Sequence, residues 1–148
     1  MVNIIPMLQV IEIYQSKITS KQELSLYLSP VRAGFPSPAD DYLDKKLDLT
    51  EHLIKHPSAT FFVKVKGESM IKAGIHSGDV LIVDRSLEPK DKKIVVAVVN
   101  GEFTVKRVRK MKDKLFLVSE NDDYAPIEIK DEIDFEVWGV VVHVIHSI

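Results

Sequence analysis

Two residues, Ser69 and Lys106, have the side chains and surroundings of a nucleophile and its base. Ser69 lies in a Gly-Glu-Ser-Met motif at residues 67–70, and Lys106 lies in the mainly apolar stretch 103–108. A hydroxyl is a weak nucleophile until a base removes its proton, and a lysine amine can act as that base only when it is neutral. Because free lysine titrates near ~10.4, burial must lower the pKa of Lys106 for it to act near neutral pH. The pair therefore predicts a serine protease that works without histidine.

The same two residues also have a plain structural explanation. A serine beside a glycine is typically a turn residue. Lys106 begins the run KRVRKMKDK (residues 106–114), and a run so rich in cations is typical of a solvated hairpin. The run could also contact nucleic acid, but Asp113 interrupts it and the chain carries a net charge of −2. We therefore expect a hairpin, and no direct sequence-specific binding of DNA.

Composition limits the class of protein. The chain has 148 residues, 45% of them hydrophobic and 28% charged, which fits one globular domain with a hydrophobic core and an appended arm. It contains no cysteine, which excludes disulfides, thiolate metal ligands and a cysteine nucleophile, and which suits the cytoplasm. No apolar run approaches about 18 residues, and residues 1–17 lack the early basic cluster of a signal peptide. We therefore expect a cytoplasmic protein without a membrane span.

Two helices are predicted before residue 59. The partly apolar N-terminal stretch predicts a short helix around Ile4–Tyr14. Asp48, followed three positions later by Glu51, forms a capping pattern for a helix over Leu49–His56, which a proline then ends. Between the two, residues 34–47 are punctuated by prolines, so this connector is predicted to run extended and exposed.

From residue 59 onward the pattern is that of short β-strands. In the first strand, Phe61, Val63 and Val65 alternate with residues of the opposite face. Asn100-Gly101, placed between two apolar runs, is typical of a two-residue hairpin turn. The further strands expected are Val80–Val83, Ile94–Val99, Glu102–Val108, Lys114–Val118 and Glu136–Ile145. Short strands with one helix among them predict a mainly β, barrel-like domain.

Two weaker patterns could indicate a metal ion. His52 and His56 are spaced i, i+4 on the predicted helix, but the glutamate of a zinc-protease motif is replaced by Leu53 and no cysteine is available. The acidic segment 120–123 lacks the glycine and the distant glutamate of a calcium loop, so it is predicted to be a turn. Neither pattern predicts a metal site, and no cofactor is expected.

Residues 30–146 resemble the LexA-like family of self-cleaving serine peptidases, in its UmuD-like branch. The resemblance rests on the G-x-S-M motif at 67–70, on Gly74 and Gly78-Asp79, and on the G-E-F-T-V-K motif that ends at Lys106. It implies a mainly β LexA/UmuD-like peptidase domain preceded by an N-terminal arm. It also implies that Ser69 is the nucleophile and Lys106 its base.

Members of this family cut their own arm at an Ala-Gly or Cys-Gly bond, which identifies Ala33–Gly34 as the implied scissile bond. The chain would then consist of a cleavable arm (1–33), an extended connector (34–47) and a β-rich peptidase and dimerisation domain (48–148). The segment around Val31–Phe35 is expected to add to the sheet as an extended strand. Whether one chain cuts itself or its dimer partner stays open.

The resemblance implies partners as well. They are a second copy of the chain in a homodimer, a RecA filament on single-stranded DNA that stimulates cleavage, and a UmuC-like subunit of a Y-family DNA polymerase. The truncated form would be an accessory subunit of this error-prone translesion polymerase in the SOS response to DNA damage. The 33-residue arm is too short for the DNA-binding domain of the repressor members, so no repressor is expected.

The alternative is a non-catalytic, dimeric binding module of the same fold that regulates a polymerase. The presence of Ser69, Lys106 and Gly34 favours retained activity, because a pure binding module could lose any of the three.

Overall fold

The computed structural model describes residues 8–17, 23–27 and 43–148. The chain divides into two compact units. One comprises Met1–Ser16 with Ser58–Ile148, and the other comprises Lys17–Pro57. The first unit contains both Ser69 and Lys106, and each unit is described by itself.

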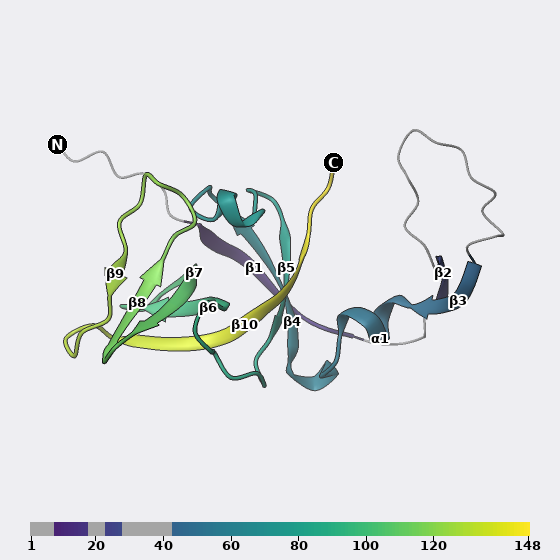
Figure 1. Ribbon diagram of the computed structural model, residues 1–148, viewed down its shortest axis with the longest axis horizontal. Helices are drawn as coiled ribbons and strands as arrows, with labels where there is room; N and C mark the ends of the chain where they lie inside the picture. Colours follow the sequence, from purple (N-terminus) through teal and green to yellow (C-terminus); the bar gives the residue numbers. More distant parts are fainter. Residues whose placement is uncertain (1–7, 18–22, 28–42) are drawn as a thin grey trace. The chain divides into compact units, whose positions relative to one another are not determined.

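The first unit is built on one antiparallel sheet of eight strands (Figure 1). Pairing of β1 with both β4 and β7 closes six of them into a barrel, in the order β1-β4-β5-β10-β6-β7, and β8 and β9 extend the sheet beyond β7. The mainly β, barrel-like fold predicted from the sequence is thereby confirmed. The strands are β1 (Gln9–Gln15), β4 (Thr60–Lys66), β5 (Val80–Asp84), β6 (Ile94–Val99), β7 (Glu102–Met111), β8 (Lys114–Val118), β9 (Ile127–Glu128) and β10 (Phe135–Ile145).

The predicted hairpin turn joins β6 to β7. Asn100 and Gly101 have φ angles of 50° and 83°, the left-handed values that a tight turn between twisted strands requires. Asparagine tolerates this region and glycine adopts it freely, so these residue types set the register that pairs Val99 with Glu102. This register places Lys106 opposite Val95, near the end of the ladder that lies away from the turn.

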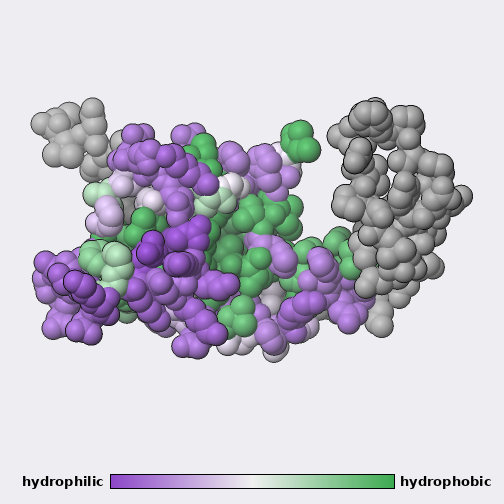
Figure 2. All heavy atoms as spheres, in the orientation of Figure 1, coloured by the Kyte–Doolittle hydropathy of each residue, from purple (hydrophilic) through white to green (hydrophobic). Residues whose placement is uncertain are grey.

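The basic run forms the β7–β8 hairpin, as predicted, with Lys112 in its turn at a φ of 56°. Its tip is exposed and lies in a hydrophilic region of the surface (Figure 2). Lys106 departs from the rest of the run, because it is 1% exposed. Charge density alone would have placed this lysine in solvent. The closed sheet buries it instead.

Apolar side chains from both sequence segments of the first unit make up the main core. Strands β4, β5, β6 and β7 contribute to it, and so do Leu8, which precedes β1, and Met70 and Ile75, which flank a 3-10 helix at Ile71–Ala73. Met70 and Ile75 are fully buried, so they hold the loop that follows Ser69 against the barrel.

The N-terminal helix predicted around Ile4–Tyr14 is wrong over residues 9–14, which belong to strand β1. This segment is antiparallel to β4, and its pairs include Gln9 with Lys66 and Gln15 with Phe61. The local apolar pattern fitted a short helix, but pairing with β4 satisfies the backbone groups of both strands and outweighs helix propensity.

In the second unit, β2 (Glu23–Tyr27) pairs antiparallel with β3 (Leu43–Asp48). The predicted helix follows as α1 (Leu49–Leu53), and the Asp48 side chain accepts a hydrogen bond from the Glu51 backbone N–H, so the predicted cap is confirmed. The helix ends earlier than predicted, at Leu53 rather than His56. No helix in the described ranges is long and apolar enough to cross a membrane.

Candidate active site

Ser69 lies in the loop that leaves the end of β4. Gly67 turns the chain with a φ of 116°, a left-handed value that favours glycine, and Ser69 follows in a fully buried position. The loop is held from outside as well, because the Asn121 side chain donates a hydrogen bond of 2.9 Å to the Glu68 carbonyl. The serine hydroxyl is therefore fixed by the backbone rather than carried on a mobile loop.

The structure brings Lys106 to this serine. The distance from Lys106 Nζ to Ser69 Oγ is 3.5 Å, and Nζ also donates to the Val105 carbonyl at 3.4 Å. A separation of 3.5 Å is long for a proton transfer, but catalytic hydrogen bonds commonly shorten when substrate binds. The two residues come from different elements, the β4 loop and β7, and the closure of the barrel places them side by side.

Burial changes the acidity of Lys106. Removal from water disfavours the charged ammonium and lowers the pKa of Lys106 to about 8. Within the described ranges no carboxylate lies close enough to Lys106 to form an ion pair that would offset this effect. A substantial fraction of this lysine is therefore neutral close to physiological pH, as a general base must be.

Leu8 covers the serine. Its backbone N–H donates a hydrogen bond of 2.9 Å to Ser69 Oγ, and its side chain is fully buried in the main core. The next residue, Gln9, pairs with Lys66 of β4 and with Thr104 of β7. The start of β1 therefore lies across the site. Sequence reasoning missed this contact because it assigned the place beside the sheet to residues 31–35.

Thr104 and Tyr124 were also missed. Thr104 lies two residues before Lys106, on the same face of β7, and its buried hydroxyl has no hydrogen-bond partner among the residues described. The Tyr124 ring has its centroid 6.0 Å from Lys106 Nζ. Period-two alternation along β7 is the sequence signal that could have found Thr104. Tyr124 follows an acidic turn and carries no such signal.

The other candidate residues lie elsewhere or outside the described ranges. Ala33 and Gly34 fall within residues 28–42, which the structure does not describe, and so does the expected strand at Val31–Phe35. His52 lies in the last turn of α1, and neither it nor His56 belongs to a potential metal-binding cluster in the described part of the chain. Residues 120–123 form the predicted turn, in which the Asn121 side chain accepts from the Asp123 N–H.

The sequence matches the model of one protein family. The match to "Peptidase S24-like" spans residues 25–142, which includes Ser69 and Lys106. The chain belongs to the peptidase S24-like family. This membership identifies it as a peptidase-type protein, and it agrees with the buried serine and lysine that the barrel brings together.

Known proteins similar to this S24 family member cover most of its length. Protein MucA of Escherichia coli is 43% identical over 135 residues, which is 90% of this chain and 92% of MucA. Protein ImpA of Shigella flexneri is 43% identical over 122 residues, or 82% of each protein. The LexA repressor of Hahella chejuensis is 38% identical over 115 residues, and the match covers 76% of this chain but 57% of the repressor.

Proposed function

We propose that this S24 family member is a self-cleaving serine protease of the SOS response. In this proposal Ser69 is the nucleophile, Lys106 is its general base, and the bond cut is Ala33–Gly34. The observation that carries the proposal is the 3.5 Å approach of Lys106 Nζ to Ser69 Oγ in a buried site, together with the lowered pKa of the lysine. A buried lysine without a carboxylate partner destabilises the fold, so a catalytic use explains its presence.

The first half of the reaction would transfer the acyl group to the enzyme. Neutral Lys106 takes the proton of Ser69 as Oγ attacks the carbonyl carbon of Ala33. The backbone N–H of Ser69 and of a neighbouring residue would stabilise the oxyanion, an interaction worth about 3 kcal/mol per donor in enzymes of this kind. When the intermediate collapses, the carbon–nitrogen bond breaks and Lys106 gives its proton to the Gly34 amine.

The second half would release the arm. Water attacks the Ser69 ester, Lys106 accepts a proton from that water, and the proton returns to Oγ as the ester bond breaks. The products are a carboxylate at Ala33 and a new amino terminus at Gly34. Because the substrate is tethered to the enzyme, proximity supplies part of the rate, and a modest base suffices.

The geometry also explains why such a protein would persist uncleaved. The Leu8 N–H donates a hydrogen bond to Ser69 Oγ. Strand β4 is paired with β1 on one edge and with β5 on the other. The segment at residues 31–35 can therefore pair with β4 only if β1 leaves. The apparent rate falls in proportion to the population of that open state.

The partners belong to the same proposal. A RecA filament on single-stranded DNA would raise the population of the open state. The truncated homodimer would then act as accessory subunit of an error-prone polymerase by binding its UmuC-like, Y-family subunit. Family membership and the resemblance to UmuD-like proteins support both steps.

The proposal is tested by following intact mass over hours at pH 7 and pH 9.5. The wild type is compared with Ser69→Ala and Lys106→Ala, and with Lys112→Ala, a matched lysine in an exposed turn of the same hairpin. We expect a fragment that begins at Gly34 from the wild type and from Lys112→Ala alone. Absence of that fragment at both pH values, also with a RecA filament present, would favour the second candidate function.

That second candidate is the non-catalytic, dimeric binding module. The hydrogen bond from Leu8 to Ser69 favours it, because a nucleophile that remains permanently covered would serve only to hold β1 in place. Chemical crosslinking of the intact protein would test the dimer independently of cleavage.

A further inference from the structure

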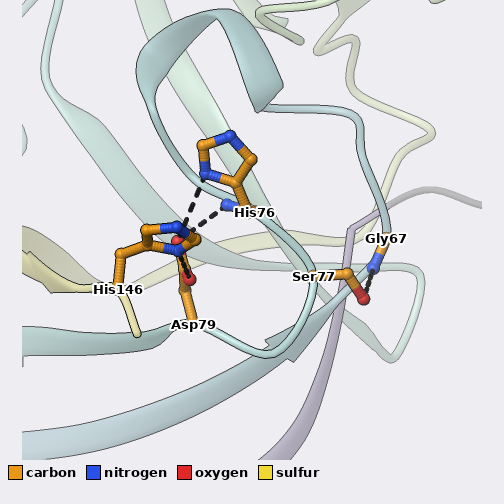
Figure 3. Close-up of polar contacts among 5 residues, drawn as sticks. All are labelled: Gly67, His76, Ser77, Asp79 and His146. Atoms are coloured by element: carbon orange, nitrogen blue, oxygen red, sulfur yellow. Dashed lines mark hydrogen bonds and ion pairs between the residues drawn. The ribbon is translucent and has the colours of Figure 1, made fainter. Parts of the chain in front are cut away.

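Away from Ser69, one end of the barrel brings together two histidines and an aspartate (Figure 3). His76 and Asp79 lie in the turn that leads into β5, and His146 follows the last residue of β10. One nitrogen from each histidine and one carboxylate oxygen all lie within 4.8 Å of one another. His146 is distant in sequence from His76 and Asp79, so no local sequence motif predicts this cluster.

The aspartate is the fixed centre of this group. Asp79 is 3% exposed, and its Oδ2 accepts a hydrogen bond of 2.8 Å from the backbone N–H of His76. Its Oδ1 lies 2.6 Å from His146 Nδ1. A buried carboxylate that faces imidazole nitrogens is a favourable place for a cation, because water no longer screens its charge.

His76 has an unused donor atom in the same place. Its Nδ1 lies 3.8 Å from Asp79 Oδ2, which is within ion-pair range but beyond hydrogen-bond distance, and this shielded nitrogen has no hydrogen-bond partner among the described residues. The ring centroids of the two histidines are 4.7 Å apart. An unpaired, shielded nitrogen usually has an explanation, and a missing ion is one of them.

We propose that His76, Asp79 and His146 form a zinc(II) site. Two imidazole nitrogens and one carboxylate oxygen are a common set of protein ligands for this ion. Bond lengths near 2.0–2.2 Å in a tetrahedron place ligand atoms about 3.3 Å apart. His146 Nδ1 lies 2.6 Å from Asp79 Oδ1, and His76 Nδ1 lies 3.8 Å from Asp79 Oδ2. These separations lie on either side of that value, so small rotations of the two rings and of the carboxylate would accommodate the ion. Both histidine side chains are about half exposed, at 44% and 49%, which leaves a fourth position for water.

The turn that carries two of the ligands is already rigid. The Gly78 N–H donates to the Val65 carbonyl at 2.8 Å, and the Val65 N–H donates to the Asp79 carbonyl at 3.1 Å. Ser77 Oγ accepts a hydrogen bond of 3.2 Å from the Gly67 N–H (Figure 3). His146 is the one ligand that lies outside this turn, so the ion would fasten the segment after β10 to the turn that braces the end of β4. This inference does not depend on the proposed protease activity.

The test measures zinc binding to the full chain in the Ser69→Ala background, which prevents self-cleavage. Chelator-treated protein is titrated with zinc chloride at pH 7.5 by calorimetry, and native mass spectrometry gives the stoichiometry. We expect one zinc ion per chain and a higher melting temperature with zinc. His76→Gln and His146→Gln should each weaken binding by at least about tenfold.

The matched control is the triple variant His52→Ala/His56→Ala/His143→Ala, which removes every other histidine and should bind zinc as tightly as the parent. Because the chain has no cysteine, thiolate binding cannot imitate the result. The cobalt(II) form of the parent should show the intense visible absorption of a four-coordinate site, and the two glutamine variants should not. Zinc affinity equal in parent and glutamine variants, affinity lost in the triple variant, or no binding to a parent folded by circular dichroism would each overturn the proposal.

Discussion

The backbone N–H of Leu8 donates a 2.9 Å hydrogen bond to the Oγ of Ser69. The donor comes from the first described residue of the arm, and the acceptor is the proposed nucleophile. The lone pair that would attack a carbonyl is thus engaged by the chain that the enzyme is proposed to cut. Cleavage then requires this contact to open, and the contact can be tested by itself.

Leu8→Pro removes the N–H donor but keeps an apolar side chain at this position. A hydrogen bond of this kind contributes about 1 kcal/mol, so its loss should raise the rate of cleavage at pH 7 by roughly fivefold. The measurement is the accumulation of the fragment that begins at Gly34. Leu8→Met retains the N–H and should cleave like the wild type. A slower Leu8→Pro variant would show instead that β1 supports the active geometry.

The rate of self-cleavage should rise with pH as Lys106 loses its proton. With a pKa of about 8, roughly a tenth of the lysine is neutral at pH 7 and about nine-tenths at pH 9, so the rate should increase about tenfold and then level off. Intact-mass time courses at half-unit intervals of pH give the profile. A rate that still rises steeply above pH 10 would mean that burial does not lower the pKa of this lysine.

Lys106→Met should abolish cleavage and stabilise the fold at neutral pH. In the folded protein the pKa of Lys106 is lowered from 10.5 to about 8, so below pH 8 folding must bury a charge that the unfolded chain carries in water. That cost is about 3 kcal/mol, and methionine, of similar shape, does not incur it.

The sign of this effect follows from proton binding. Between pH 8 and 10.5 the unfolded wild type holds a proton that the folded state has lost, so its stability rises with pH over this window. The advantage of Lys106→Met should therefore shrink from pH 8 to 10.5. Urea unfolding of both proteins at pH 7 and pH 10 measures it, in a Ser69→Ala background. A variant that is less stable than its parent at pH 7 would contradict the prediction.

Gly139→Ala should destabilise the barrel. A Cβ at this position would lie 2.5 Å from Cγ1 of the buried Val83, whose branched side chain has little freedom to move. Overpacking of this kind costs about 1–3 kcal/mol. Thermal unfolding should show the loss. Gly74→Ala is the matched control, because its Cβ would meet no atom within 4 Å. Any loss of stability in that variant should come only from the left-handed backbone at this position.

Local signals predicted much of the barrel correctly. The Asn100-Gly101 turn, the alternation in β4 and the Asp48 cap each depend on a few neighbouring residues, and the structure has all three. Strand β1 was not predicted, because its strand character comes from its pairing with β4, which is distant in sequence. Residue types and surroundings suggested Ser69 and Lys106 as a pair, and the family resemblance supported it. The hydrogen bond from Leu8 to Ser69 and the approach of His76 to His146 had no signal in the sequence.

Strand β1 is held in the barrel by hydrogen bonds to β4 and β7, and not by the covalent chain alone. If the Ala33–Gly34 bond is cut as proposed, hydrolysis takes place in the open state, when β1 has already left β4. What changes is its effective concentration: a tethered segment becomes a free peptide that rebinds only at a rate set by dilution. The intact chain would visit the open state only transiently, whereas after cleavage the severed arm rarely returns, and the surface that β1 covered stays available to a partner.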